Sequence, residues 1–312
     1  MRVLVTCPPM LGRISAYLPI FAKYGLEVTT PNVVQTLSVP ELLEIVPKHD
    51  GWIIGDDQAT REVFTRGKEG KLRVAVKWGI GTDNVDFSAC KDLEIPICNT
   101  PNMFGDEVAD IAMGYVIALS RETFSIDSSV RNGGWPKPQG ISLAGKTIGI
   151  IGFGNIGSSL ASRALASKMR VLAFDPNLTS SAADIPGVEF VGWPDRLCEI
   201  DFLVVTCSLT KSSYHLIDEK SLKMMKSGVR IVNVGRGPII DEFALEGALK
   251  SNHVHSAALD VFEVEPLPTM SYLRSHPKCI FGSHNASNTI EAVDRTSNIA
   301  INKIVEFFGL VG

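Results

Sequence analysis

Short runs of β-branched and other apolar residues alternate with helical patterns along the chain, and this alternation limits most strongly what the chain can fold into. The alternation occurs in two series. The first contains strand candidates at residues 2–6, 27–30, 51–55, 73–78 and 96–99. The second contains strand candidates at residues 147–152, 170–174, 188–191, 202–206, 230–234, 256–260 and 279–282. Because strands that alternate with helices form parallel βαβ units, the sequence predicts an α/β fold with two Rossmann-like domains, each a mostly parallel sheet flanked by helices.

The order of these elements also predicts how the chain divides into domains. A length of 312 residues suits about two domains of roughly 150 residues. A helical stretch at residues 106–132 separates the two series and breaks at the Gly- and Pro-rich segment 133–140. The last segment, 297–312, is an amphipathic helix with no strand after it, so it must pack on an earlier domain. We therefore predict a discontinuous domain of residues 1–99 and 286–312, and a continuous domain of residues 100–285.

A glycine-rich turn opens the second series. Gly152, Gly154 and Gly157 have the spacing GxGxxG, directly after a strand candidate and at the start of a helical pattern. The first glycine permits a tight turn, the second lets the backbone approach a pyrophosphate, and the third permits close packing of helix on strand. Asp175 follows the next strand candidate, where a carboxylate accepts hydrogen bonds from an adenosine ribose and repels a 2′-phosphate. The pattern predicts NAD(H) rather than NADP(H), with a flavin, S-adenosylmethionine or an incidental glycine-rich turn as less favoured alternatives.

Charged residues follow three consecutive strand candidates of the second series. Arg236 follows 230–234, and His284 follows 279–282. The segment between them, ALDVFEVEPLP, places Asp260 and two glutamates, Glu263 and Glu265, after 256–260. Because the carboxyl ends of parallel strands share one edge of the sheet, these side chains are expected to converge where ligands bind.

The arginine, a glutamate and the histidine together suit the oxidation of a 2-hydroxy acid. A guanidinium would clamp the substrate carboxylate and carbonyl oxygen. An imidazole would exchange the hydroxyl proton, and a glutamate bonded to that ring would hold its proton for reduction. Each residue by itself is more often structural, so the prediction depends on their joint placement. Spacing alone does not decide between Glu263 and Glu265.

Other features exclude several classes of partner. The net charge of −4 gives no reason to expect nucleic acid or an anionic membrane, and no apolar run approaches the ~18 residues of a membrane span. His253 and His255 lack carboxylate or cysteine neighbours at ligand spacing, so no metal site is predicted. The six cysteines form no CxxC pair, and the amino-terminal run lacks the features of a signal peptide. The expected compartment is the cytoplasm, with reduced thiols.

Several motifs resemble those of the D-isomer-specific 2-hydroxyacid dehydrogenase family, most closely its phosphoglycerate dehydrogenase-like branch. The matching segments, between about residues 72 and 290, are GIGTDNVD (79–86), NTPNMFGDEVADIAMGYVIALSR (99–121), LAGKTIGIIGFGNIG (143–157), NVGRGPIIDEFALEGAL (233–249), ALDVFEVEPLP (258–268) and SHNAS (283–287). The resemblance implies that residues 1–99 and 286–312 form the substrate (catalytic) domain, and that residues 100–285 form the NAD-binding domain.

The resemblance also assigns roles to single residues. The catalytic set falls on Arg236, Glu265 and His284, with Glu265 chosen over Glu263 because it directly precedes Pro-Leu. The cofactor set, besides the three glycines, falls on Asn155, Ile156, Asp175, Cys207, Val234 and Asp260. The loop that receives the substrate carboxylate in the family falls on Gly79, Ile80 and Gly81.

The sequence departs from the family pattern at three places. Leu209 stands where the family usually has a proline over the cofactor. The segment 55–63 replaces an arginine-containing loop, and its Asp56 and Asp57 would repel an anionic substrate. Lys77 could supply the missing positive charge, or it could be a solvent-facing strand lysine. The regulatory extension of long-form phosphoglycerate dehydrogenases is absent, so inhibition by serine is not expected.

These observations predict an NAD-dependent oxidoreductase that transfers a hydride between NAD(H) and a small, anionic D-2-hydroxy or 2-keto acid. The candidate substrate is 3-phosphoglycerate, and glyoxylate or hydroxypyruvate is the alternative. A non-catalytic NAD(H)-sensing protein of the same fold is the alternative from another functional class. The resemblance further implies a homodimer formed through residues 106–140.

Overall fold

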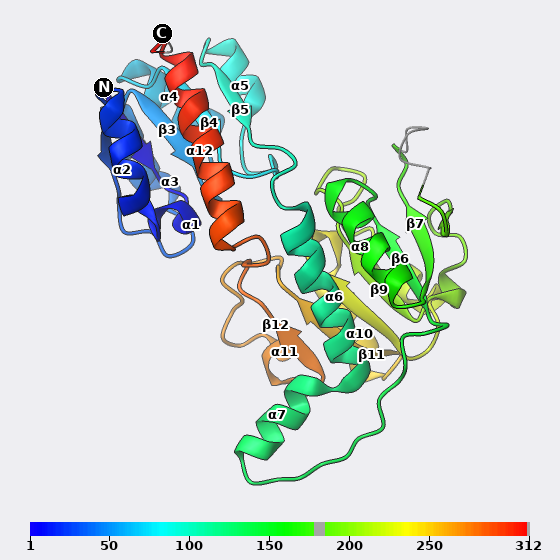
Figure 1. The fold of residues 1–312 in the computed structure, drawn as a ribbon. Coiled ribbons are helices and arrows are strands. Elements are labelled where there is room, and N and C mark those ends of the chain that lie inside the picture. The colour runs from blue at the N-terminus through cyan, green and yellow to red at the C-terminus, as the bar shows by residue number, and fades with distance from the viewer. Residues whose placement is uncertain (178–184, 311–312) are drawn as a thin grey trace. The chain divides into compact units, whose positions relative to one another are not determined.

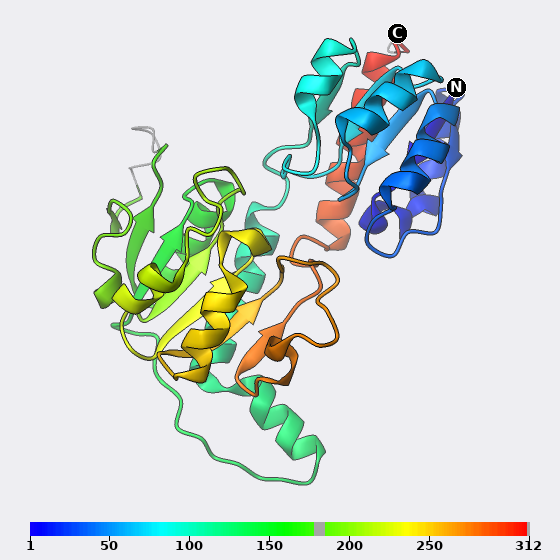
Figure 2. The ribbon, with the colours of Figure 1, turned by 180° about the vertical axis from the view of Figure 1, so that it is seen from behind.

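The computed structural model describes residues 1–177 and 185–310, and the chain divides into two compact units. Unit 1 contains Met1–Met103 and Asn288–Gly312, and unit 2 contains Phe104–Ser287. The sequence predicts changes of domain after residues 99 and 285. Each unit holds a sheet whose strand pairs are all parallel, so the predicted α/β class with two Rossmann-like domains is confirmed (Figures 1 and 2).

Unit 1 is built on a five-stranded sheet of order β2-β1-β3-β4-β5. Its strands are β1 (Arg2–Val5), β2 (Glu27–Thr29), β3 (Gly51–Ile54), β4 (Val74–Lys77) and β5 (Ile97–Asn99). Its helices are α1 (Pro8–Leu11), α2 (Ile14–Lys23), α3 (Val39–Ile45), α4 (Arg61–Glu69), α5 (Phe87–Asp92) and α12 (Ile290–Phe307), with a short 3₁₀ turn at Val46–Lys48. Strands β3 and β4 are buried along their whole length, as expected for central strands covered by helices on both faces.

Unit 2 is built on a seven-stranded sheet of order β12-β11-β10-β9-β6-β7-β8. Its strands are β6 (Thr147–Ile151), β7 (Arg170–Phe174), β8 (Val188–Phe190), β9 (Phe202–Val205), β10 (Val229–Asn233), β11 (Val254–Leu259) and β12 (Cys279–Phe281). The chain leaves β6 toward β7 and β8 and then returns to β9 on its other side. This reversal between β6 and β9 is the point at which dinucleotides bind in open parallel sheets.

Helices lie on both faces of the second sheet. The helices of unit 2 are α6 (Gly105–Arg121), α7 (Thr123–Arg131), α8 (Asn155–Ala166), α9 (Glu219–Met224), α10 (Glu242–Lys250) and α11 (Tyr272–Ser275), with short 3₁₀ turns at Leu197–Glu199 and Gly237–Ile239. Helices α6 and α8 pack together on one face, and α9 and α10 pack together on the other (Figures 1 and 2). Among the helices of the described residues, none combines the length and the apolar character needed to cross a membrane.

The strands follow the predicted ranges to within a residue or two, whereas two helical predictions need correction. The stretch predicted at 106–132 is two helices, because Glu122 adopts a left-handed conformation (φ 52°) between α6 and α7. The last helix begins at Ile290 rather than at 297, because the Thr289 side chain accepts a hydrogen bond from the Ala292 N–H and caps it. It ends at Phe307, and residues 311–312 of the predicted helix lie outside the described residues. Helix α12 packs against α1, α2 and β4 of unit 1.

Candidate active site

The three glycines of the turn between β6 and α8 differ in their surroundings: two pack against neighbouring backbone, and one borders open space. Gly152 has φ +91°, and a Cβ added there would lie 2.6 Å from the backbone of Cys207. A Cβ added at Gly157 would lie 2.1 Å from the Gly152 carbonyl oxygen. A Cβ added at Gly154 would meet no described atom within 4 Å. Packing therefore explains the first and third glycines, whereas the space at Gly154 suits a ligand that approaches the backbone closely.

The groups around this turn suit a pyrophosphate and an adenosine ribose. Gly154 precedes α8, so the backbone N–H groups of Asn155 and Ile156 belong to the first turn, where the helix dipole favours an anion. The Asp175 carboxylate lies beside the turn, because its Oδ2 accepts a hydrogen bond of 2.7 Å from the Phe153 N–H. Its Oδ1 accepts a second of 2.8 Å from the Asn177 N–H. The residues present therefore fit a dinucleotide such as NAD.

Alanine substitutions in the glycine turn should separate packing from ligand binding. Gly157→Ala is expected to destabilise the fold by about 1–3 kcal/mol or more, because the added methyl meets backbone that cannot move away. Gly154→Ala is expected to leave the melting temperature near that of the wild type while weakening NADH binding by about tenfold or more. Thermal unfolding and NADH fluorescence titration measure the two effects. NADH affinity unchanged in Gly154→Ala would contradict the role given to that space.

Cys207 lies where three loops of unit 2 meet. Its backbone faces Gly152 after β6, and its carbonyl oxygen would be 2.8 Å from a Cβ added at Gly235 after β10. Burial raises the pKa of its thiol to about 12, so the sulfur stays protonated and is neither a nucleophile nor a ready metal ligand. Leu209, where the family usually has proline, packs against the hydrophobic core of the unit. Val234 is also buried, and its N–H donates to the Val205 carbonyl at 3.1 Å.

The loop that carries Arg236 is held by a buried amide that sequence reasoning missed. The Asn233 side chain is 1% exposed, donates from Nδ2 to the Arg236 carbonyl at 2.9 Å, and accepts from the Gly235 N–H at 3.0 Å. The signal was available, because the polar Asn233 interrupts the apolar run 231–234 two residues before Gly235. A Cβ added at Gly237 would lie 1.8 Å from the Phe262 carbonyl carbon. The loop after β10 therefore packs backbone to backbone on the loop after β11.

The structure pairs one glutamate with the candidate acid–base histidine. His284 Nδ1 lies 2.8 Å from Glu265 Oε2, and both side chains are about one-fifth exposed (22% and 21%). Glu265 Oε1 accepts a further hydrogen bond of 2.9 Å from the Phe262 N–H, which fixes the carboxylate. Glu263 lies 2.9 Å from a different imidazole, that of His215. The choice that spacing left open therefore falls on Glu265.

His284 is held in an unusual backbone conformation by Asp260. Its φ of +56° lies in the left-handed region, which costs energy for a residue other than glycine and persists only where the surroundings impose it. The His284 N–H donates to the Asp260 carbonyl at 2.7 Å. The Asp260 carboxylate, 2% exposed, accepts from the N–H groups of Asn285 and Ala286 at 3.2 and 2.9 Å. Asp260 thus anchors the loop that presents the imidazole.

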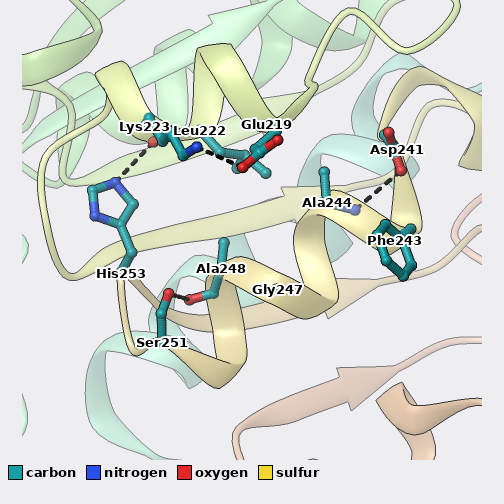
Figure 3. Close-up of a pocket in the computed structure, with 10 residues that line it drawn as sticks. All are labelled: Glu219, Leu222, Lys223, Asp241, Phe243, Ala244, Gly247, Ala248, Ser251 and His253. Atoms are coloured by element: carbon teal, nitrogen blue, oxygen red, sulfur yellow. Dashed lines mark hydrogen bonds and ion pairs between the residues drawn. The ribbon is translucent and has the colours of Figure 1, made fainter.

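His253 and His255, the two histidines considered for a metal, each bond a different protein group. Figure 3 shows His253 beside a groove between α9 and α10, where its Nε2 bonds the Leu222 carbonyl at 2.8 Å. His255 Nδ1 lies 3.0 Å from the Ser256 hydroxyl, and burial and Arg230 lower the pKa of His255 to about 4. Among the described residues, one group of three potential ligands lies close enough to be considered for a metal, and it contains neither of them: His215, Asp241 and Glu263.

In unit 1, the charge of Lys77 is paired with that of Asp56, and Asp57 is buried. The Lys77 side chain is 3% exposed, donates to the Gly55 carbonyl at 2.7 Å, and pairs with Asp56 at 3.1 Å. Lys77 therefore does not face solvent. Asp57 is fully buried and accepts hydrogen bonds from the Leu37 N–H and the Thr6 hydroxyl, and burial raises its pKa. The expectation that both aspartates would repel an anion is wrong for Asp57, whose carboxylate lies in the core.

The loop expected to receive a substrate carboxylate directly follows β4 and Trp78. Gly79 has φ +108°, a conformation that favours glycine, and its N–H donates to the Thr100 hydroxyl at 2.7 Å. The Asn99 amide donates to the Ile80 carbonyl at 3.0 Å, and the Ile80 side chain is 37% exposed. Gly81 completes the loop. Side chains at the end of β5 therefore hold its backbone in place.

Known proteins resemble this chain along nearly its whole length. Residues 113–286 match the family described as D-isomer specific 2-hydroxyacid dehydrogenase, NAD binding domain. Hydroxypyruvate reductase from Thermotoga maritima is 37% identical over 294 residues, which cover 92% of this chain and 93% of that protein. D-3-phosphoglycerate dehydrogenase from Methanocaldococcus jannaschii is 34% identical over 89% of this chain, which spans about half (53%) of that protein. The crystal structure of the TT0316 protein from Thermus thermophilus has a TM-score of 0.87 at 28% identity, and the match covers 99% of this chain and 97% of that one.

The fold and the glycine turn define a dinucleotide-binding α/β oxidoreductase, and these matches identify which kind. The chain belongs to the D-isomer-specific 2-hydroxyacid dehydrogenase family. It is an NAD-dependent enzyme of that class, so the predicted family, enzyme class and cofactor are confirmed. The relatives are named for different substrates, and family membership therefore leaves open which acid this enzyme uses.

Proposed function

We propose that this enzyme interconverts a short 2-keto acid of the glyoxylate or hydroxypyruvate type and the corresponding D-2-hydroxy acid. The observation that carries the proposal is the 2.8 Å contact between His284 Nδ1 and Glu265 Oε2, on the sheet edge where Arg236 follows β10. The near full-length similarity to a hydroxypyruvate reductase supports the choice of substrate.

The roles of the protein groups follow from their chemistry. Bound NAD(H) supplies the hydride donor or acceptor. The planar guanidinium of Arg236 would bind the substrate carboxylate and the carbonyl oxygen, and would stabilise the negative charge that forms on that oxygen. With Glu265 at Nδ1, the His284 proton that is exchanged with the substrate oxygen would be at Nε2. Asp175 and the first turn of α8 would hold the adenosine side of the cofactor, and Val234, Cys207 and Asp260 would line its remainder.

The charges in unit 1 favour a substrate with a single anionic group. We propose that the Gly79–Ile80–Gly81 backbone binds the substrate carboxylate. Lys77, the nearest preceding cation in sequence, is buried and pairs with Asp56, so its charge is already compensated. A second anionic group, such as the phosphate of 3-phosphoglycerate, would need further cations. The alternative is that 3-phosphoglycerate is the substrate and that Lys77 contacts it.

A substrate panel tests this proposal. NADH oxidation is followed with glyoxylate, hydroxypyruvate, pyruvate and 3-phosphohydroxypyruvate, at equal enzyme concentration. Glyoxylate or hydroxypyruvate is expected to give a kcat/KM at least about tenfold above that of the phosphorylated acid. A preference for 3-phosphohydroxypyruvate would contradict the choice of substrate. Tight NADH binding without turnover of any acid would instead favour the NADH-sensing alternative.

We also propose that the enzyme is a homodimer formed through residues 106–140. Helix α7 and the segment after it extend away from the sheet of unit 2 (Figures 1 and 2). No residue of α7 is buried, and Phe124 and Trp135 are 57% and 77% exposed. An apolar surface of this kind is typical of a protein interface. Sedimentation should show a dimer for the wild type and a larger monomer fraction for Phe124→Asp with Trp135→Ser, and a wild-type monomer would contradict the proposal.

The cytoplasm is the proposed compartment. All six cysteines are free thiols in the structure: Cys7, Cys90, Cys98, Cys198, Cys207 and Cys279. Unpaired thiols in this number suit a reducing environment. Fractionation of the cells that express the protein tests the assignment.

A further inference from the structure

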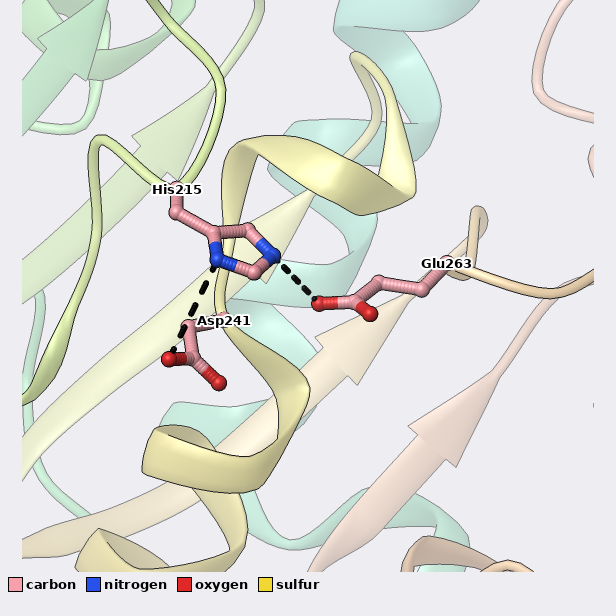
Figure 4. A group of neighbouring side chains, drawn as sticks. All are labelled: His215, Asp241 and Glu263. Atoms are coloured by element: carbon pink, nitrogen blue, oxygen red, sulfur yellow. Dashed lines mark hydrogen bonds and ion pairs between the residues drawn. The ribbon is translucent and has the colours of Figure 1, made fainter.

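A second histidine–carboxylate cluster lies in unit 2 next to the elements of the active site. His215 Nε2 is 2.9 Å from Glu263 Oε1, and His215 Nδ1 is 4.0 Å from Asp241 Oδ2 (Figure 4). The three side chains are about 30% exposed. The ring of Tyr214 stacks on the imidazole, with centroids 4.1 Å apart and planes 15° apart. None of these residues has a role in the proposed reaction.

The partners of the cluster favour hydrogen bonding over metal binding. One potential ligand atom from each of the three residues lies within 4.8 Å of the others, but Glu263 Oε1 is already 2.9 Å from His215 Nε2 (Figure 4). The carboxylates also have other partners. Asp241 Oδ1 caps α10 by accepting from the Ala244 N–H at 3.0 Å, and Glu263 Oε1 accepts from the Glu242 N–H at 3.1 Å. The cluster is better described as a set of hydrogen bonds between loops.

Those hydrogen bonds join the loops that follow three adjacent strands. His215 lies on the segment after β9, and its N–H donates to the Pro238 carbonyl at 2.8 Å, in the loop after β10. Its ring reaches Glu263 in the loop after β11. Glu263 in turn is bonded twice to Glu242, the first residue of α10: its N–H donates to Glu242 Oε1 at 2.7 Å, and its Oε1 accepts from the Glu242 N–H. Glu242 is thus a third carboxylate beside the cluster, and burial raises its pKa.

We propose that His215 is a positioning residue for catalysis, which fixes the loops that carry Arg236 and Glu265 relative to each other. Glu263 and Glu265 belong to one tight loop, because Glu265 Oε1 accepts from the Phe262 N–H. Gly237, next to Arg236, touches that same loop at Phe262. His215 bonds both loops, so it connects the residue that would bind the substrate with the residue that holds His284. The inference rests on the proposed function of Arg236, Glu265 and His284.

Two observations argue that His215 does more than stabilise the fold. Its backbone is in the left-handed region (φ +48°), which is uncommon for a residue other than glycine and is maintained by the surrounding contacts. A partly exposed pair of this kind contributes little to stability. A small displacement of catalytic groups, by contrast, lowers the rate strongly, by about 100-fold for an error near 1 Å.

The test compares His215→Ala with two matched variants. His215→Gln keeps a donor toward Glu263, and His253→Ala removes a histidine of unit 2 that bonds one backbone carbonyl, that of Leu222. His215→Ala is expected to lower kcat for keto-acid reduction by about 10–100-fold, with NADH affinity and melting temperature close to those of His253→Ala. His215→Gln should recover most of kcat. Glu263→Ala should behave as His215→Ala does, and the double variant should be no worse than either single variant.

Hydrogen exchange separates this inference from the proposed function. Amide exchange at residues 235–237 and 262–265 should be faster in His215→Ala than in His253→Ala, and this readout does not depend on turnover. If the wild type reduces no keto acid, the proposed function fails while the exchange result still decides whether His215 fixes the loops. The inference is overturned if His215→Ala keeps the wild-type kcat and exchange pattern. Loss of kcat on EDTA treatment with recovery on adding Zn²⁺ would also overturn it, in favour of a metal site.

Discussion

His284→Asn is expected to lower kcat for keto-acid reduction by roughly 10²–10⁴-fold, the usual contribution of a positioned proton donor. Asparagine is the suitable replacement, because it tolerates the left-handed backbone (φ +56°) better than most residues other than glycine. Its amide can also donate to Glu265 while offering no proton to the substrate oxygen. Binding of NADH should change little, so the loss should appear in kcat when NADH oxidation is followed at saturating cofactor.

Neighbouring carboxylates supply the control for this experiment. Glu265→Gln should reduce the rate, because the amide no longer supports a positive charge on His284, whose Nδ1 is 2.8 Å away. Glu263→Gln should retain most of the activity, since an amide can still bond His215. Full activity in His284→Asn would refute the assignment of His284 as the acid–base residue. Equal losses in the two glutamine variants would refute the distinction between Glu263 and Glu265.

Arg236→Lys is expected to lower kcat/KM for the keto acid by about 10²–10³-fold, comparable to the loss of a main donor to a developing oxyanion. The charge is kept, but the planar pair of N–H donors that matches a carboxylate is lost. The loop itself should keep its shape, because Asn233 holds the Gly235 N–H and the Arg236 carbonyl through backbone groups. Steady-state kinetics should show the main change in KM and in kcat for the acid, and little change in KM for NADH.

A surface arginine provides the comparison for Arg236→Lys. Arg66 pairs with Glu69 on the exposed face of α4, so Arg66→Lys should leave all kinetic constants near those of the wild type. The melting temperatures of both lysine variants should also agree within a few degrees. If Arg236→Lys reduces the keto acid as well as Arg66→Lys does, the guanidinium does not clamp the substrate.

Local patterns were sufficient for the strands and for the glycine turn. A buried parallel strand is a short apolar run, and a dinucleotide turn needs glycine at set positions, so both are visible without tertiary information. Helix ends were less accessible. The start of α12 at Ile290 depends on the Thr289 cap. The break between α6 and α7 occurs at Glu122, which is left-handed although it is not a glycine, so the sequence gives no sign of it.

Long-range contacts explain the remaining differences. His215 was passed over because Glu263, which its ring bonds, lies in a loop distant in sequence. Asn233 was missed although it bonds Gly235 and Arg236 within three residues of itself. Asp57 was expected in a loop that faces the substrate, and Lys77 was expected to face either the substrate or the solvent. Both are buried, because their charges or hydrogen bonds are satisfied inside unit 1.

By itself, the sequence determined the α/β class, the dinucleotide turn at Gly152–Gly157 and the three strand ends that carry Arg236, an acidic pair and His284. These features follow from periodicity and from the conformational needs of glycine, which are local properties. The spacing of charges left Glu263 and Glu265 open and the choice of Glu265 rested on the family motif, whereas only the tertiary structure shows which of the two bonds His284. Glu263 and Glu265 are two residues apart, and the path of their loop directs one side chain to His215 and the other to His284.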